Sequence, residues 1–398
     1  MKTAENQFEH TLPVADLSVS RIINQKALID AVLKKKKHGI SKAMLAKELG
    51  LSKPAVSKNV ADLIAMGLIQ ECGEGEAGKT GGRKPIILRL NETYRYIFAL
   101  DFSFQEPVCA IGDLYCNVLQ LRKIKIGKNA TAAAKKEKIW QTLQEMAGDL
   151  NISMDKIGLV IISQPGVIGE DGEARDPKAR HRTWIGVGLK KYLREQLHVP
   201  ILVGNDVNLA AIGEAYFGSD ASIQDLIYII CGVGLGAGIV IDGKLWEGRN
   251  RAAGEIGDSL QKGDRCIEDI VTISGVLERI ASTLDSSEEQ EDLTFARVVE
   301  LVNANDPIVT KVIYEVGCEL GHLTYNCNVM LDIPVVVLGG DCLKLGQPLL
   351  DGIESVLEQK PLFRPKVIPS TLKEIASILG GFMVGRNEIL NKKIEKGV

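Results

Sequence analysis

The chain of 398 residues lacks the features that mark secreted, membrane-bound and metal-binding proteins. Its eight cysteines include no Cys-x-x-Cys pair, and with five histidines they offer no obvious set of four zinc ligands. The longest run without charge, residues 226–241, is too short to cross a bilayer comfortably and holds four glycines. The first residues carry charge and no apolar core, unlike a secretory signal. We therefore expect reduced thiols in a cytoplasmic protein with no membrane span, metal or cofactor.

Net charge is also nearly absent, but the two ends of the chain differ. Residues 1–90 carry a net charge of +6 and the remaining residues carry −9, which leaves −3 for the whole chain. A positive end on a mildly acidic protein is typical of a DNA-binding head joined to a body that binds a small molecule. With 45% hydrophobic residues, the chain can bury two or three cores.

Residues 41–90 have the capping and turn pattern of a winged helix-turn-helix domain. Ser41 can cap a helix that Gly50 closes, and Ser52 can cap a second helix with Pro54 in its first turn. A preceding helix over 17–37 would complete a three-helix unit. The alternative interpretation is a small helical domain that makes protein contacts.

The second helix of this pair is the one expected to meet DNA. Val56, Val60, Leu63 and Ile64 form its buried stripe. Four polar residues would face outward, toward phosphates and base edges: Lys53, Ser57, Lys58 and Asn59. The predicted DNA-contacting residues of this helix are Lys53, Pro54, Ser57, Lys58 and Asn59.

Two β-rich runs, 68–71 and 86–90, are joined by a glycine-rich, basic loop that is typical of a wing. In this loop we predict that Lys79, Arg83 and Lys84 contact the DNA backbone or minor groove. Residues 73–80 also match the P-loop pattern, Gly-x-x-x-x-Gly-Lys-Thr. A P-loop needs a helix directly after it, and the Gly-Gly-Arg-Lys-Pro that follows cannot start one promptly. We therefore predict a wing and not a phosphate loop.

From Tyr94 onward, strand and helix signals alternate, which predicts an α/β body with mixed sheets and two lobes around a cleft. The glycines of 232–238 lie between two predicted strands, whereas a Rossmann loop leads from a strand into a helix. Such a hairpin can cradle a phosphate or simply pack tightly, and both interpretations stay open. The predicted strands are 94–101, 107–112, 118–126, 157–163, 201–203, 226–231, 237–241 and 334–338, and the predicted helices are 132–150, 190–197, 209–217, 292–303, 308–328 and 372–390.

Several motifs occur together in an informative order. They are Gly-Asn-Asp-Val-Asn at 204–208, the hairpin glycines, Ala-Gly-Glu-Ile-Gly at 253–257, and Val-Leu-Gly-Gly at 337–340. With the winged-helix head, they make the chain resemble the ROK family (repressors, open reading frames and sugar kinases), in particular its xylose-repressor-like and N-acetylglucosamine-repressor-like members. The resemblance implies an actin-like, ribonuclease-H-like body with a sugar in the cleft, and a homodimer or a dimer of dimers.

The resemblance also implies a domain layout and a nucleotide side of the cleft. The winged helix-turn-helix would occupy 1–90 and the ROK domain 91–398, with lobe one at 91–205 plus the terminal helix 372–391, and lobe two at 206–371. Kinases of the family begin with Asp-x-Gly-Gly-Thr, but this chain has Asp-Phe-Ser-Phe-Gln at 101–105, so both glycines are lost. Because phosphoryl transfer depends on positioning the phosphates, this loss argues against kinase activity. The vestigial nucleotide-binding residues would be Asp101, Gly232, Gly234, Gly236, Gly339 and Gly340.

The sugar side of the cleft is better preserved. Asp206 matches the family's base, which takes a proton from a sugar hydroxyl, although it could instead cap the helix at 209–217. Asp258 replaces the family's zinc-binding His, and of the cysteine-rich loop only Cys266 and Glu268 remain, so no zinc site is expected. The predicted sugar-binding residues are Asn205, Asp206, Glu255, Asp258, Glu268 and His181.

Charge beside His181 leaves the nature of the ligand open. Arg180 or Arg182 could face the pocket and favour a phosphorylated or acidic sugar, or both could be solvated at the surface. We predict a repressor of carbohydrate metabolism, such as xylose metabolism, that binds an operator in double-stranded DNA and a sugar in a catalytically inactive cleft. The alternatives are a DNA-binding protein with residual sugar kinase activity, and an interaction module with an empty cleft.

Overall fold

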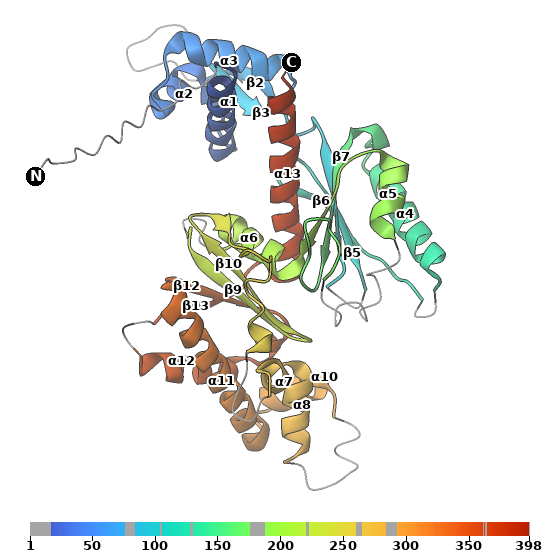
Figure 1. Cartoon of the computed structure of the whole chain (residues 1–398), viewed down its shortest axis with the longest axis vertical. Coiled ribbons are helices and arrows are strands. Elements are labelled where there is room, and N and C mark those ends of the chain that lie inside the picture. The colour runs from blue at the N-terminus through green and yellow to red at the C-terminus, as the bar shows by residue number, and fades with distance from the viewer. Residues whose placement is uncertain are drawn as a thin grey trace, which may run out of the picture. The chain divides into compact units, whose positions relative to one another are not determined.

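The computed structural model describes most of the chain as two compact units (Figure 1). The head comprises residues up to Arg95 together with those from Arg386 onward, and the body comprises Tyr96–Gly385. The described residues are 17–75, 84–103, 106–127, 130–175, 188–219, 223–259, 265–283, 293–360, 362 and 364–397.

The head is a three-helix unit with a small sheet. Its helices are α1 (Leu17–Lys34), α2 (Lys42–Leu49) and α3 (Lys53–Ala65), and its strands β1 (Ile40–Ser41), β2 (Ile69–Glu74) and β3 (Ile86–Leu90) pair antiparallel in the order β1-β3-β2. These elements confirm the predicted helix-turn-helix and the strands on either side of the wing.

Local capping explains where the head helices begin and end. The Ser41 Oγ accepts the Met44 N–H at 3.3 Å, and the Ser52 Oγ accepts the Ala55 N–H at 3.3 Å. Gly50 ends α2 in the left-handed region with φ of 64°. The prediction for α1 was too long, because Lys35–Lys37 form a turn after Lys34. Fully buried Leu28, Leu45, Val60, Leu63, Leu68 and Leu88 form the core of the unit.

The body contains two five-stranded sheets with the same plan. In the first sheet the order is β6-β5-β4-β7-β8, and in the second it is β11-β10-β9-β12-β13. Each sheet has three antiparallel strands followed by two parallel ones, which confirms two like lobes. The strands are β4 (Tyr96–Asp101), β5 (Val108–Gly112), β6 (Val118–Lys123), β7 (Ile157–Gln164), β8 (Ile201–Asn205), β9 (Leu226–Cys231), β10 (Leu235–Ile241), β11 (Lys244–Leu245), β12 (Val335–Gly339) and β13 (Lys366–Pro369).

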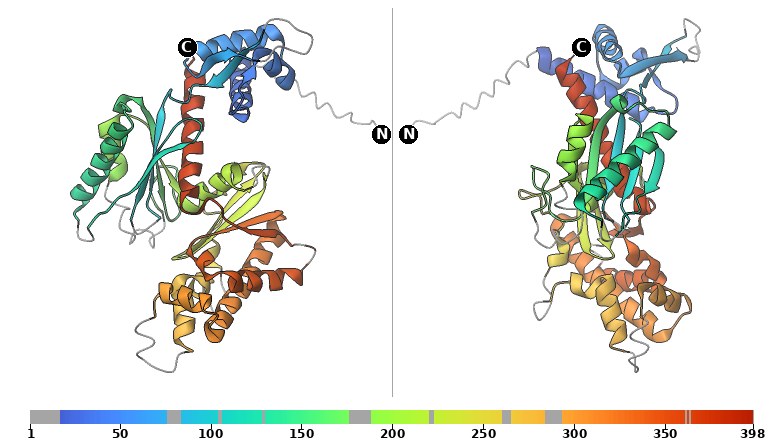
Figure 2. Two further views of the ribbon diagram at one scale, coloured as in Figure 1. Left: turned by 180° about the vertical axis from the view of Figure 1, so that it is seen from behind. Right: turned by 90° about the vertical axis from the view of Figure 1, so that its right-hand side faces the viewer.

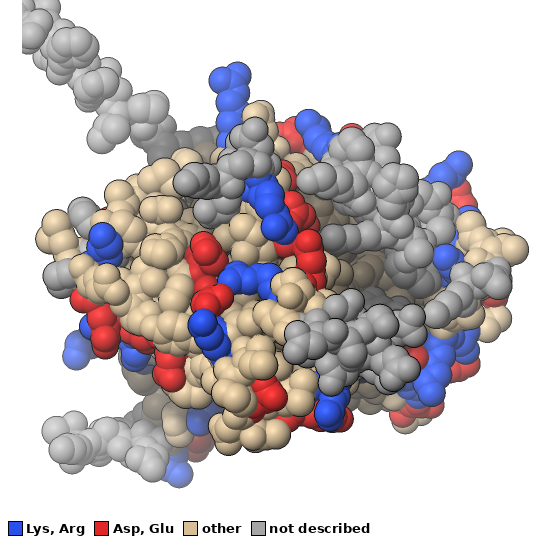
Figure 3. Space-filling model, turned by 90° about the horizontal axis from the view of Figure 1, so that it is seen from below, with Lys and Arg blue, Asp and Glu red and all other residues tan. Residues whose placement is uncertain are grey.

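Helices cover both sheets. Helices α4 (Ala132–Asp149) and α5 (Leu189–Leu197) share a core with the first sheet, and α6 (Asp206–Phe217) packs against the second (Figure 2). The opposite face of the second sheet packs on α7 (Glu268–Val271), α8 (Ile273–Ala281), α10 (Phe295–Asn303), α11 (Pro307–Leu331) and α12 (Gln347–Glu358). No helix in the described part of the chain combines the length and apolarity needed to cross a bilayer. Where Figure 3 shows described residues, acidic and basic side chains are interspersed, with no large patch of one sign.

Helix α13 (Ala376–Lys396) belongs to both units. In the body, the buried Phe382 ring occupies the space beside Gly112, and Gly381 lies against Ile161. In the head, the Lys26 Nζ lies 2.8 Å from the Glu395 carboxylate. The sequence assigned the whole terminal helix to lobe one, whereas the part from Arg386 onward contacts the head.

The two lobes of the body meet where α6 and α13 cross. A Cβ on Gly380 would lie 1.8 Å from the Leu209 carbonyl oxygen, and one on Gly213 would lie 2.1 Å from that of Ala376. Glycine at both positions is therefore required for the backbones to come this close.

Candidate functional sites

Helix α3 presents a polar, exposed side. Lys53, Pro54, Ser57 and Lys58 are all exposed, while Val56, Val60 and Leu63 are fully buried. Four of the five residues of α3 that the sequence predicted to contact DNA are therefore exposed, and the fifth, Asn59, is not.

Asn59 does not face outward. Its side chain is only 6% exposed, and its Nδ2 donates to the Ala55 carbonyl oxygen at 2.9 Å. The prediction that Asn59 faces outward was wrong because position 59 lies on the same side of the helix as Val56 and Leu63. A base contact from this side chain would require it to leave the core.

The strands on either side of the wing pair with each other. Glu74 of β2 lies opposite Ile86 of β3, and the Gly75 N–H donates to the Pro85 carbonyl oxygen at 2.8 Å. A hairpin is not the strand-loop-helix arrangement of a P-loop. Lys84 is exposed at the base of this hairpin, whereas Lys79 and Arg83 lie outside the described residues.

In the body, a cavity of about 1540 Å³ lies between the two sheets. The predicted sugar-binding residues that line it are Asn205, Asp206, Glu255, Asp258 and Glu268, and the predicted nucleotide-side residues that line it are Asp101, Gly232, Gly234, Gly236 and Gly340. Gly339 does not line it, because the Tyr228 side chain occupies the space beside that glycine. His181 falls in a segment outside the described residues.

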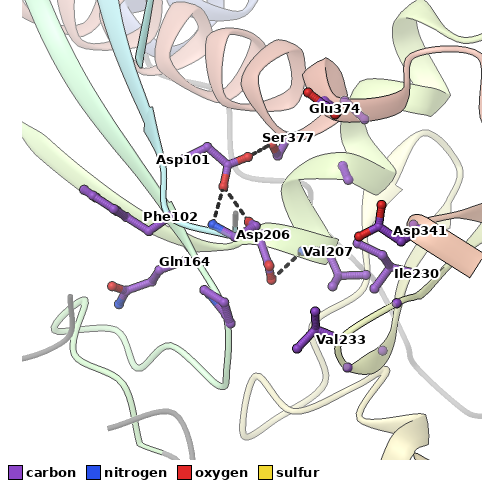
Figure 4. Close-up of a pocket in the computed structure, with 18 of the residues that line it drawn as sticks. Asp101, Phe102, Gln164, Asp206, Val207, Ile230, Val233, Asp341, Glu374 and Ser377 are labelled. Atoms are coloured by element: carbon purple, nitrogen blue, oxygen red, sulfur yellow. Dashed lines mark hydrogen bonds between the residues drawn. The ribbon is translucent and has the colours of Figure 1, made fainter. Parts of the chain in front are cut away.

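Two carboxyl groups, those of Asp101 and Asp206, form the polar centre of the cavity (Figure 4). The Asp101 Oδ1 accepts the Ser103 N–H at 2.8 Å and also the Ser103 hydroxyl, and its Oδ2 accepts the Ser377 hydroxyl from the first turn of α13. The Asp206 Oδ1 accepts the Val207 N–H at 2.9 Å.

Burial controls the protonation of this pair. Desolvation raises the pKa of Asp101 above its usual value, although hydrogen bonds from Ser103 and Ser377 oppose the shift. Desolvation, and after it the Asp101 carboxylate, raises the pKa of Asp206 to about 6. At neutral pH Asp206 is therefore mostly ionised, and its carboxylate can accept a hydrogen bond from a hydroxyl in the cavity.

Asn205, and not Asp206, caps α6. The Asn205 Oδ1 accepts the Asn208 N–H at 2.8 Å, and its Nδ2 donates to the Gly166 carbonyl oxygen at 3.1 Å. This cap starts the helix at Asp206, three residues before the predicted start at Leu209. The interpretation of Asp206 as the cap was wrong, and Asp206 remains at the cavity wall.

Lobe two supplies a second group of carboxylates. The Glu268 Oε2 accepts the Leu235 N–H at 3.3 Å and so supports the glycine hairpin between β9 and β10. Gly257 packs closely here, since a Cβ there would lie 2.6 Å from the Leu235 carbonyl oxygen and 2.7 Å from the same Glu268 oxygen. Glu255 and Asp258 are exposed on the neighbouring turn. Nowhere in the described ranges do three or more His, Cys, Asp or Glu side chains gather as metal ligands would.

Sequence reasoning missed several residues of the cavity. Gln164 ends β7 beside the end of β4, where Asp101 lies. Parallel strands present their carboxyl ends at one edge, so this signal could have found it. Ser377 had no such signal, because it meets Asp101 only across 276 residues of sequence.

The structure therefore defines a class of proteins in which a winged helix-turn-helix is joined to a two-lobed α/β body with an acidic cleft. Within that class the chain belongs to the ROK family, whose sequence profile matches residues 98–387. A MarR family profile matches residues 18–79 in the head.

Relatives match across both units. The xylose repressor of Caldicellulosiruptor bescii is 26% identical over 388 residues, which cover 90% of this chain and 94% of that protein. The N-acetylglucosamine repressor of Escherichia coli strain CFT073 is 24% identical over 371 residues, which cover 88% and 90%.

Solved structures share the fold. A ROK family transcriptional regulator, described as a homologue of the E. coli MLC protein, superposes with a TM-score of 0.78 at 20% identity, covering 95% of this chain and all of that one. A ROK glucokinase of Streptomyces griseus, in complex with glucose and AMPPNP, has a TM-score of 0.61 at 20% identity and covers 73% of this chain and 98% of its own.

Proposed function

We propose that this chain is a sequence-specific DNA-binding transcriptional regulator, a repressor of carbohydrate-metabolism genes controlled by a sugar or sugar derivative. The observation that carries the proposal is the union of a winged-helix head and a ROK body in one chain. Relatives that match along 88–90% of the chain, through both units, are repressors of sugar-related genes by name. Such a protein would act on DNA in the cytoplasm.

In this proposal DNA is held by the exposed side of α3. Lys53, Ser57 and Lys58 are side chains that donate to phosphates and base edges in the major groove. Lys84, with Lys79 and Arg83, would contact the backbone or minor groove from the wing. A homodimer would place two α3 helices about 34–36 Å apart on a two-fold symmetric operator.

The sugar would be held by both lobes. The Asp206 carboxylate accepts a sugar hydroxyl from one side, and Glu255, Asp258 and Glu268 accept others from lobe two. A ligand that contacts both lobes favours one lobe arrangement. It changes DNA affinity by no more than the difference between its affinities for the two arrangements.

We further propose that the cleft is catalytically inactive. Both Asp101 oxygens already accept hydrogen bonds from Ser103 and Ser377, and neither glycine of the kinase motif is present. Residual kinase activity is the second candidate, favoured by Asp206, because a pKa of about 6 suits a general base. ADP release with ATP and a sugar panel tests this. Sugar-dependent ADP release that disappears in Asp206→Asn would establish a kinase.

The regulator itself is tested by selecting its DNA. Purified full-length protein is mixed with sheared genomic DNA of the source organism at low salt, where phosphate contacts are strongest, and the retained fragments are sequenced. We expect enrichment of a two-fold symmetric site, and a change in its affinity when sugars related to the adjacent genes are added. Uniform retention of all fragments would contradict sequence-specific regulation.

A further inference from the structure

The chain returns from the second sheet of the body to the first through a short segment. Strand β13 lies at the edge of the second sheet, and α13 packs on the first, where Gly381 lies against Ile161. Residues 370–375 join the two, and we name them the crossing segment. A change in the arrangement of the lobes has to be accommodated there. Five of the six residues also line the cavity: Ser370, Leu372, Lys373, Glu374 and Ile375.

The backbone of the crossing segment is held in an unusual conformation. Lys373 has φ of 51°, in the left-handed region that residues other than glycine adopt at a cost. Such a conformation persists only where its surroundings hold it. The Lys373 N–H donates to the Ser370 Oγ at 3.1 Å, and the Ser370 N–H donates to the Leu338 carbonyl oxygen at 2.7 Å. The shape of the segment therefore depends on where Ser370 lies.

Glu214 of α6 holds this part of the crossing segment. The residue is only 4% exposed, and its Oε1 accepts the Ser370 hydroxyl and, at 3.4 Å, the Leu372 N–H. Burial raises the pKa of Glu214, and these two hydrogen bonds oppose the shift. Because desolvating a carboxyl group is unfavourable, its bonds to the crossing segment offset the cost of its burial. Glu214 does not itself line the cavity.

Both sides of this contact lead to the carboxyl pair of the cavity. Asp206 begins α6, and Glu214 lies two turns along the same helix, about 12 Å away by the rise of an α-helix. In the other direction, the crossing segment leads into the first turn of α13, where the Ser377 hydroxyl donates to Asp101 (Figure 4). A ligand that shifts α6 at Asp206 therefore also shifts Glu214 and the segment it holds, because a helix moves as a rigid element.

We propose that Glu214 is a positioning residue that couples the effector site to the arrangement of the lobes by holding the crossing segment against α6. This inference rests on the proposed function and concerns the regulation of the same site. Glu214 contacts neither the sugar nor DNA. It sets how far contact of the effector with Asp206 changes the lobe arrangement, and hence the ratio of operator affinities with and without effector.

The test measures this ratio in the full-length protein. Fluorescence anisotropy gives the affinity for the DNA site that the wild type selects, without sugar and with saturating xylose, glucose or N-acetylglucosamine. In the wild type we expect one of these sugars to change operator affinity at least about fivefold. In Glu214→Ala the crossing segment loses both bonds, and the same sugar should change operator affinity by less than about twofold. Calorimetry should show a sugar affinity within about threefold of wild type, since Glu214 does not line the cavity.

Further variants separate coupling from stability. Glu214→Gln keeps an amide oxygen that can accept both bonds and should restore a ratio close to that of the wild type. Leu143→Ala destabilises the body through the core of the first sheet without removing a bond to the crossing segment, and its ratio should persist. Glu300→Ala, which removes an exposed acid from α10, should also keep the ratio. Ser370→Ala removes the bond to Glu214 from the other side, and its ratio should fall even where Glu214→Ala does not fold.

The outcomes separate this inference from the function on which it rests. A ratio that persists in Glu214→Ala and Ser370→Ala would overturn the coupling role and leave a sugar-controlled repressor. An equal fall in Leu143→Ala would assign the effect to lost stability, and a fall in Glu214→Gln would assign it to lost charge, and either result would overturn the role of the two bonds. A wild type that selects no DNA site, or whose operator affinity no sugar changes, would overturn the proposed function as well.

Discussion

The exposed side of α3 and the cleft of the body assemble their polar groups in opposite ways. On α3, Lys53, Ser57 and Lys58 lie within six residues of one helix and face water. In the cleft, Asp101, Asp206 and Glu268 come from β4, α6 and α7, and burial raises the pKa of the first two. A binding face on one helix can be predicted from helical periodicity. A buried site cannot, because it depends on which distant segments of the chain the fold brings together.

The sharpest test of this contrast is Asp206→Ala. We expect the sugar to bind at least a hundredfold more weakly, because a buried acceptor for its hydroxyl is lost, while operator binding without sugar is unchanged. Calorimetry measures the first and fluorescence anisotropy with labelled operator the second. Asp351→Ala, an exposed acid on α12, is the matched control. Unaltered sugar affinity in Asp206→Ala would place the ligand elsewhere.

The converse test is Lys58→Ala. Operator affinity should fall about ten- to a hundredfold, and the salt dependence of binding should become shallower by about one unit if Lys58 contacts a phosphate. Sugar affinity should not change. Lys311→Ala removes an exposed lysine from α11 in the body and should alter neither measurement. Equal losses of DNA and sugar binding in Lys58→Ala would show that the two sites are not separate.

Acid pH should weaken sugar binding at the buried site. Because the pKa of Asp206 is about 6, its carboxylate is mostly ionised at pH 7 and mostly protonated at pH 5. We expect sugar affinity to fall about tenfold between these values, since the ionised form is the better hydroxyl acceptor. In Asp206→Asn the pH dependence should be much flatter. A wild-type affinity that is constant from pH 7 to 5 would contradict this role.

The same group makes stability depend on pH. Asp206 titrates near 3.8 when unfolded and about 6 when folded, so the folded chain holds more protons between these values. The contribution of Asp206 to the free energy of unfolding therefore falls as pH rises through this window, and the raised pKa of Asp101 acts in the same direction. Urea denaturation at pH 4.5 and 7 should show a smaller difference in Asp206→Asn than in the wild type.

The smallest expected effects are those of two substitutions on α3, Asn59→Ala and Ser57→Ala, which should differ in whether they change stability or DNA binding. Asn59→Ala loses the bond to the Ala55 carbonyl oxygen inside the head and should lower the free energy of unfolding by about 1 kcal/mol. Its operator affinity, measured well below the melting temperature, should stay within about twofold of wild type. Ser57→Ala should do the reverse, with a modest loss of operator affinity and little change in stability. Normal stability with strongly weakened operator binding in Asn59→Ala would restore Asn59 as a DNA contact.

The sequence alone was sufficient to predict those features of the structure that local interactions determine. Ser41, Gly50 and Ser52 set the helix-turn-helix, because caps and left-handed turns act within a few residues. The alternation of strands and helices, and the order of the glycine and Asn-Asp motifs, were enough to predict two lobes with a cleft. Periodicity also distinguished most of the exposed side of α3 from its buried side.

Other features, which depend on contacts between distant segments, were decided only by the tertiary structure. The inward placement of Asn59 depends on packing against the head core, and the bond that ties Asn205 to the Gly166 carbonyl oxygen joins segments 39 residues apart. Ser377 reaches Asp101 only because α13 returns to the first sheet, and the pKa of Asp206 depends on the burial that results. The sequence determined which groups are present, while desolvation and long-range packing, which have no local pattern, determined which of them meet.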